Sequence, residues 1–135
     1  MSKRRKAREV AIQLLYKDDF NEQQRLDPTF IVGRLNNDRK LAEFCTDLVK
    51  GVRDHSDEID QALVSVLDNW KLERVAATDR NILRLGTYEL LYSDTPGPVV
   101  INECIELARR FGNEQSHQFV NGILDRVLAK RSSNA

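Results

Sequence analysis

The chain has 135 residues, of which 41% are hydrophobic and 31% charged, and its acidic and basic side chains balance at 21 each. This composition predicts one folded domain and excludes an intrinsically disordered chain. No segment is long and apolar enough for a membrane span or a signal peptide, so we expect a cytoplasmic protein. The two cysteines exclude a disulfide framework and lack the spacing of a metal site.

The balanced charge hides a basic segment at the start of the chain. Residues 1–8 carry five positive charges and no negative one, whereas the rest has 16 Lys and Arg against 21 Asp and Glu. Such a segment indicates an anionic partner that is bound at one end of the chain. A solvated, frayed terminus explains the same charge equally well.

Apolar residues recur with a helical period almost throughout the chain, and we predict about seven helices and no strand. The first helix spans residues 3–19. Asp27 before Pro28 is typical of a helix start and begins a short helix with Phe30 among its inward side chains. Residues 36–38 end that helix and begin the third.

The second half of the chain continues the helical pattern. Ser56 is predicted to cap a fourth helix whose apolar stripe extends to Trp70. The rigid connector at residues 96–98 precedes a sixth helix, which has Gly112 as its C-terminal cap. The last helix is predicted from about Glu114.

The fifth helix is predicted to begin at Thr78 and Asp79 and to lie at the centre of the fold. Residues 82–92 are apolar on nearly all sides, which is typical of a buried helix. Gly86 costs about 1 kcal/mol relative to Ala in a helix interior. A close crossing with another helix would explain its presence.

No group of residues predicts catalysis, a metal site or a bound cofactor. Cys45 and Cys104 fall on predicted core stripes, where reduced and packed thiols are expected. His55 lies at a helix end and is expected to be structural or at the surface. His117 has no ligand at metal-site spacing on its helix, and no Gly-rich phosphate loop is present.

The first helix combines cations with an aromatic ring on one face. The residues predicted to lie opposite the core stripe are Arg5, Glu9, Ile12 and Tyr16, and Arg8 lies beside Ile12. Arg side chains contact phosphates and a tyrosine ring stacks on bases, which is the combination that single-stranded nucleic acid requires. Packing of Ile12 and Tyr16 against another helix is an equally good interpretation.

The last helix has a similar stripe turned away from its core residues. Asn121 and Gly122 are poor helix-interior residues, and close approach of a base or backbone would explain them. We favour the alternative, in which another helix packs tightly around Gly122 and Asn121 bonds to a neighbouring backbone. The better contact candidates are Gln115 and Phe119. The full stripe is Gln115, Phe119, Gly122, Arg126 and Lys130.

Four segments of the chain form a linked set of motifs. Their letters are RKARE followed by Ala11 and QLLY (5–16), DRNILRL with YEL (79–90), INE with ELA (101–108), and FVNGILD (119–125). In this order they resemble the bacterial NusB family of transcription antitermination factors, and LDNW at 67–70 fits as well. The resemblance covers essentially the whole chain.

The resemblance implies an all-α fold, a single compact domain of two helical bundles at about 3–54 and 56–131. It implies pairing with NusE, a ribosomal small-subunit protein, and joint binding of boxA-type RNA in the antitermination complex with RNA polymerase. Ribosomal RNA operons are the expected targets. The resemblance is compatible with both a monomer and a homodimer.

The resemblance also implies site residues. Some relatives carry an acidic residue at the position of Gln115. Asp79 and Arg80 are expected to contact RNA or the partner. The expected RNA-binding residues are Lys3, Arg4, Arg5, Lys6, Arg8, Tyr16, Gln115 and Phe119.

Two other functions fit a helical chain of this kind. One is an RNA-binding domain that resembles the N-terminal domain of ribosomal RNA cytosine methyltransferases, whose chains continue into a catalytic domain with a cofactor site. This sequence ends at Ala135 without such a domain, so that interpretation requires a fragment. The other is a helical adaptor that binds protein helices and has no salt-dependent affinity for RNA.

Overall fold

A computed structural model describes residues 3–69 and 71–133, and in this part of the chain every regular element is helical, which confirms the all-α prediction. The described residues form two compact units, one ending at Asp54 and the other beginning at His55. The elements are α1 (Lys3–Asp18), α2 (Pro28–Arg34), α3 (Arg39–Asp54), α4 (Ser56–Val64), the 3-10 helix η1 (Leu72–Arg74), α5 (Ala77–Tyr92), α6 (Gly97–Phe111) and α7 (Ser116–Ser133).

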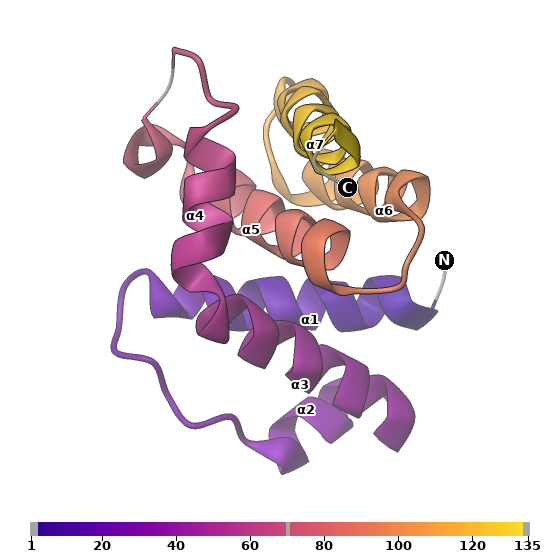
Figure 1. Cartoon of the computed structure of the whole chain (residues 1–135). Coiled ribbons are helices and arrows are strands. Elements are labelled where there is room, and N and C mark those ends of the chain that lie inside the picture. Colours follow the sequence, from indigo (N-terminus) through magenta and orange to yellow (C-terminus); the bar gives the residue numbers. More distant parts are fainter. Residues whose placement is uncertain (1–2, 70, 134–135) are drawn as a thin grey trace. The chain divides into compact units, whose positions relative to one another are not determined.

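The first unit consists of α1, α2 and α3, and α3 packs against both of the other helices (Figure 1). The apolar stripe of α1 is buried as its period predicts, with Ala7, Val10 and Ala11 inaccessible to solvent. On α3, Cys45 and Val49 are equally buried. Burial of these two stripes provides the hydrophobic free energy that holds the unit together.

Polar side chains define the helix ends of the first unit as predicted. The Asp27 carboxylate accepts hydrogen bonds from the backbone N–H groups of Thr29 and Phe30, at 3.0 and 3.3 Å. Asp38 likewise accepts a 3.1 Å bond from the N–H of Leu41 at the start of α3. These carboxylates satisfy backbone donors that have no partner inside the helix.

The turn between α2 and α3 uses two asparagines in the left-handed region, Asn36 at φ 56° and Asn37 at φ 60°. Asparagine tolerates this conformation better than most residues. The expectation that Phe30 points inward is wrong. Its ring is 42% exposed, and the cationic groups of Lys17 and Arg34 each lie 5.8 Å from its centre. The short helix α2 buries only one side, on which Ile31 lies.

The second unit is built around α5, which contacts α4, α6 and α7. Ile82, Leu83 and Leu85 are fully buried, so the prediction of a central helix is confirmed. A Cβ atom built on Gly86 would lie 2.8 Å from Leu124 of α7 and 2.9 Å from Cys104 of α6. The predicted close crossing therefore exists.

Several helix ends of the second unit differ from the prediction. Ser56 does not cap α4, because the capping position is His55 and its side chain makes no capping bond. The helix ends at Val64 instead of continuing to Trp70, which lies outside the described residues. Asp68 and Asn69 follow, and such side chains favour turns over helix interiors.

The boundaries of the last three helices lie close to their predicted positions. Helix α5 begins one residue before Thr78, and α6 begins at Gly97, inside the predicted connector. Gly112 caps α6 as predicted, although its φ of −94° is not left-handed. Helix α7 begins at Ser116, two residues after the predicted start. None of the described helices has the length and apolar character needed to cross a membrane.

Candidate nucleic-acid interface

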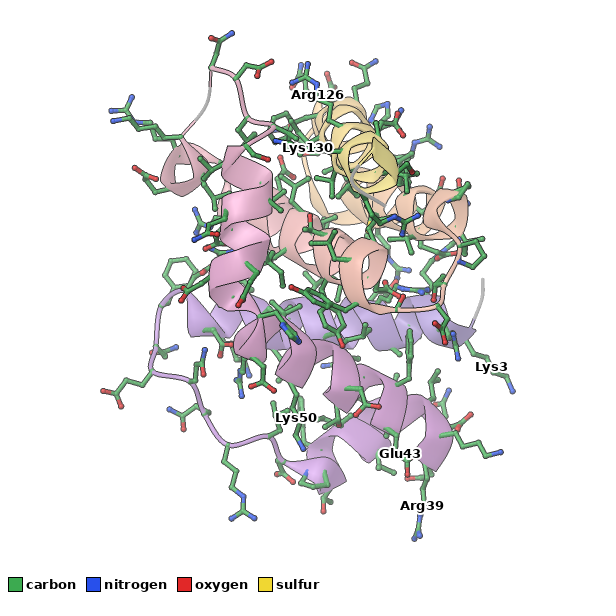
Figure 2. All side chains as sticks on the ribbon, in the orientation of Figure 1. Lys3, Arg39, Glu43, Lys50, Arg126 and Lys130 are labelled. Atoms are coloured by element: carbon green, nitrogen blue, oxygen red, sulfur yellow. The ribbon has the colours of Figure 1, made fainter. Side chains whose placement is uncertain are left out.

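Residues 3–8 of the basic segment form the first turns of α1, which contain no acidic residue before Glu9. Lys3 and Arg4 are exposed and Arg5 and Lys6 are half-buried; Lys3 extends from the start of the helix (Figure 2). The N-terminus of a helix carries a partial positive charge, so cations there are unfavourable for the helix itself. Part of this charge is balanced within the helix, since the Lys6 ammonium lies 3.6 Å from the Glu9 carboxylate.

Two of the arginines meet one aromatic ring of α3. The guanidinium carbon of Arg4 lies 4.4 Å from the centre of Phe44, and that of Arg8 lies 5.2 Å away. The prediction that Arg8 and Ile12 share an exposed face is wrong, because they are 2% and 5% exposed. Glu9 between them is buried as well. The buried surface of α1 is thus wider than its apolar stripe, since long polar side chains also cover apolar surface.

Tyr16 is accessible at the far end of α1, as a contact residue must be. Its side chain is 41% exposed and its ring centre lies 5.0 Å from that of Phe20. Phe20 is 64% exposed, and its backbone N–H bonds to the carbonyl of Lys17 in the turn that ends the helix. Phe20 follows the periodic segment, so the helical pattern does not predict it as a contact residue, and its spacing of four from Tyr16 is the one signal for it in the sequence.

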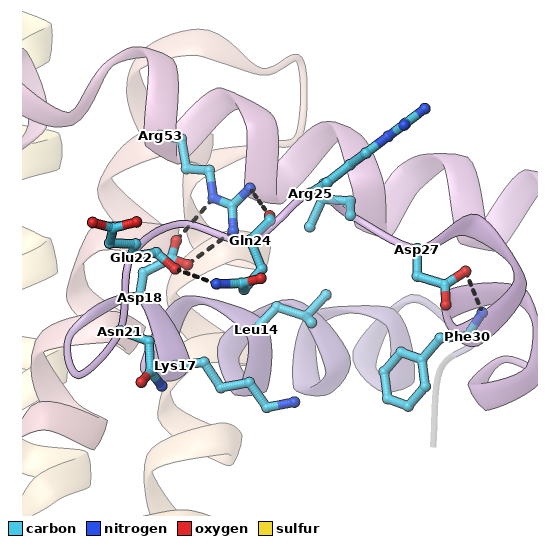
Figure 3. A pocket seen from close by; sticks show the side chains of 11 residues that line it. Leu14, Lys17, Asp18, Asn21, Glu22, Gln24, Arg25, Asp27, Phe30 and Arg53 are labelled. Carbon is cyan, nitrogen blue, oxygen red and sulfur yellow. Dashed lines mark hydrogen bonds and ion pairs between the residues drawn. The ribbon is translucent and has the colours of Figure 1, made fainter.

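Arg53 holds the connection between α1 and α2 in place (Figure 3). Its guanidinium makes two 2.8 Å bonds to the Asp18 carboxylate and one of 3.1 Å to the carbonyl of Gln24. The adjacent hollow, of about 420 Å³, is lined by three basic and three acidic residues. It therefore has no preference for one sign of charge. Lys17 and Phe30 form part of its wall.

In the second unit, Asp79 lies beside the start of α7. The Ser116 hydroxyl donates a 3.0 Å bond to the Asp79 carboxylate and accepts one of 2.9 Å from the N–H of Asn113. Asp79 is only 7% exposed. The structure thus joins Asp79 to Ser116, the residue after Gln115, and Gln115 itself is exposed.

Arg80, the neighbour of Asp79, is directed to the turn that precedes α5. Its Nη1 donates to the carbonyls of Glu73 and Val75, at 3.3 and 2.9 Å. These bonds attach η1 to the start of α5. Arg80 was expected to contact RNA or the partner, and this structural role could not be predicted, because carbonyl partners leave no signal in a sequence.

The middle of α7 is open where tight packing was expected. Asn121 and Gly122 are exposed, and a Cβ atom on Gly122 would meet no atom of the described residues within 4 Å. The favoured interpretation, tight packing around Gly122, is therefore wrong. Phe119 is half-buried at the edge of a hollow of about 240 Å³. This hollow is lined by Asp68, Asn69, Gln118, Phe119, Gly122, Ile123 and Arg126.

The two cysteines are packed in the core, and the ring of His55 is stacked on another aromatic ring. Cys45 and Cys104 are free thiols and are buried, as predicted. Burial raises the pKa of the Cys45 thiol to about 12, and the positive charge of Arg34 opposes part of this rise. The ring of His55 stacks on that of Tyr92 with 4.0 Å between centres. Among residues 3–69 and 71–133, no group of His, Cys, Asp and Glu is arranged to hold a metal ion.

Two helical units, a cationic helix start and exposed rings define an all-helical binding protein. The NusB family model matches residues 5–129. Over 130 residues the chain is 44% identical to the transcription antitermination protein NusB of Solibacter usitatus, covering 94% of this chain and 89% of that one. The chain therefore belongs to the NusB family of transcription antitermination proteins, which confirms the prediction that it is not an enzyme.

Solved structures show the same fold. NusB of T. maritima is 35% identical and superposes with a TM-score of 0.83, covering 98% of this chain and 97% of that one. Antitermination factor NusB in a crystal structure with NusE and double-stranded RNA is 26% identical, with a TM-score of 0.76 and coverage of 96% and 98%. These similarities extend over both units.

Proposed function

We propose that this chain binds boxA-type single-stranded RNA together with the ribosomal small-subunit protein NusE, and so supports processive transcription of ribosomal RNA operons by RNA polymerase. The observation that carries the proposal is the arrangement of α1, with exposed cations at its start and the exposed Tyr16 near its end. Membership of the NusB family supports it. The solved NusB–NusE complex supports joint binding, since that assembly also contains RNA.

A single-stranded ligand fits the exposed rings better than a duplex does. Lys3 and Arg4 supply charge for phosphates of either form, but stacking on Tyr16 requires an unpaired base. Gln115, directly before α7, and Phe119 on α7 supply an amide and a second ring. Buried Arg8 and Asp79 act in this proposal by positioning their neighbours.

The ribosomal partner is proposed to bind the second unit. Residues 55–135 contain nine Lys and Arg against twelve Asp and Glu, and ribosomal proteins are usually basic. Complementary charge of this kind accelerates association more than it slows dissociation. Added salt should therefore lower the association rate first. Crosslinks from the partner that fall only on residues 3–54 would contradict this placement.

Binding of a boxA-type RNA, measured with and without the ribosomal protein, tests the function. We expect the pair to bind more tightly than this chain alone. Tyr16→Ala should lose about 1–3 kcal/mol of RNA affinity, as expected for one stacked base, whereas Tyr16→Phe should keep it. Absence of RNA binding by the wild-type chain in both conditions would refute the proposal, and partner binding alone would favour a protein adaptor.

A further inference from the structure

The hollow beside Phe119 has the features of a pocket for one nucleobase. We propose that it receives a single unpaired base of the bound RNA, over the backbone of α7 at Gly122 and beside the ring of Phe119. This proposal rests on the proposed function, because it names a subsite for the same RNA. It extends that function to the turn at Asp68 and Asn69, which sequence analysis did not connect with RNA.

Gly122 provides the first argument, because packing does not explain it. Gly in a helix interior costs about 1 kcal/mol relative to Ala. At Gly86 the space is occupied, since Leu124 would lie 2.8 Å from a Cβ atom. At Gly122 none of the described residues has an atom within 4 Å of that position. The missing side chain instead leaves the helix surface open to a flat group from outside.

The walls of the hollow provide the second argument. Gln118 and Asn69 are exposed, and each side-chain amide offers both a donor and an acceptor, as base edges require. Phe119 adds an aromatic surface. The volume of about 240 Å³ is smaller than the roughly 300–1,000 Å³ of pockets for drug-sized ligands, so the hollow suits a base and not a whole nucleotide.

Arg126 provides the third argument, because its interactions make the hollow unsuitable for a phosphate. The guanidinium of Arg126, labelled in Figure 2, donates to the carbonyl of Val66 at 3.0 Å and to the Asp68 carboxylate at 3.1 Å. Asp68 thus balances its charge locally. The same two bonds attach the turn after α4 to α7 and hold Asn69 beside the hollow. Arg126 is therefore a positioning residue.

Filling the hollow from the helix tests the proposal. Gly122→Leu should lower the affinity for boxA-type RNA by roughly 5- to 150-fold, the equivalent of one stacked base, and Gly122→Ala by a smaller factor. Gly33 on α2 is the matched control, since it is exposed and also has nothing within 4 Å of a built Cβ atom. Gly33→Ala and Gly33→Leu should bind RNA as the wild type does.

Folding is monitored separately by thermal melting. Gly122→Ala should melt at or above the wild-type temperature, because the added methyl group meets no atom in the described part of the chain and Ala favours a helix. A stable Gly122→Ala variant with reduced RNA affinity keeps the test valid if Gly122→Leu folds poorly. Wild-type affinity in both Gly122 variants would overturn the proposal.

RNAs that lack one base at a time identify the bound position. At one position the losses from the missing base and from Gly122→Leu should not add, because both remove the same interaction. Additive losses at every position would overturn the proposal, as would a loss confined to the ribosomal partner's affinity. If the wild-type chain bound no RNA, the proposed function itself would fail, and this result is distinct from the others.

Discussion

The hydroxyl of Ser116 and the carboxylate of Asp79 are joined by a buried hydrogen bond of 3.0 Å. The bond connects the first residue of α7 to the first turn of α5, which are 37 positions apart in the chain. Gln115 precedes this serine directly, and Phe119 follows one helical turn later. The candidate contact residues Gln115, just before α7, and Phe119, on its second turn, therefore depend on an anchor that is itself almost inaccessible.

Removal of this anchor should destabilise the protein. Ser116→Ala leaves a nearly buried carboxylate without its serine partner, and such a loss costs about 1–3 kcal/mol. Urea denaturation would measure the change in the free energy of unfolding. Ser132→Ala near the exposed end of α7 is the control and should change it by less than about 0.5 kcal/mol. Equal stability of the two variants would show that the bond contributes nothing.

Gly86→Ala should destabilise the fold although Ala is the better helix former. The added Cβ atom would lie 2.8 Å from Leu124 and 2.9 Å from Cys104, and both neighbours are fully buried, so neither side chain has space to move away. Overpacking typically costs about 1–3 kcal/mol, more than the 1 kcal/mol or so that Ala gains in a helix.

A double-mutant cycle with Leu124→Ala measures the clash at this crossing. The second substitution makes space for the methyl group, so the combined loss should be smaller than the sum of the separate losses. Strict additivity would mean that Gly86 and Leu124 do not compete for the same space.

Neutralising exposed cations of α1 should weaken RNA binding in a salt-dependent way. Arg8 is buried, so the informative substitution is the pair Lys3→Gln and Arg4→Gln. The slope of log affinity against log salt should decrease by about 0.7 for each phosphate of a single strand that these cations no longer neutralise. Arg39→Gln with Lys40→Gln removes the same charge from the exposed start of α3 and serves as control. Identical slopes for both pairs would exclude the start of α1 from the interface.

Cys45 should make stability depend on pH in the alkaline range. Burial raises the pKa of its thiol from 9.0 to about 12, so the unfolded chain loses this proton at lower pH than the folded chain. The stabilisation is complete below pH 9 and is lost as the pH rises toward 12. Through this group the free energy of unfolding falls by at most about 1.4 kcal/mol per pH unit.

Urea denaturation of wild type and Cys45→Ala between about pH 7 and 10.5 isolates this contribution, since other groups titrate in both proteins. The free energy of unfolding should fall more steeply above pH 9 in the wild type. Parallel curves would show that Cys45 ionises equally in the folded and unfolded chains.

The parts of the fold that could be predicted depend on local signals. The cap at Asp27, the break at Asn36 and Asn37 and the close crossing at Gly86 each follow from the chemistry of one or two residues. The end of α4 was predicted too late because the apolar period continues past Val64, whereas the chain leaves the helix before Asp68. Periodicity does not distinguish a helical turn from a buried turn of another shape.

The site could be predicted only in part, because exposure depends on the tertiary structure. Tyr16 is accessible as expected, but Arg8 is buried although its residue type is typical of surfaces. Gly122 was interpreted as a packing residue, as Gly86 was, since both are helical glycines in a sequence. Only the tertiary structure distinguishes them. Leu124 and Cys104 lie close to Gly86, whereas no described residue lies within 4 Å of a Cβ atom built on Gly122.

The crossing of α5 and α7 also has a consequence for how NusB-family sequences diverge. The space beside Gly86 is filled by the side chain of Leu124. A larger residue at position 86 therefore requires a smaller residue at position 124. Relatives with a side chain at position 86 should carry a smaller residue than leucine at position 124. The two positions should therefore co-vary across the family, as pairs in spatial contact do, whereas position 122 should vary independently of both.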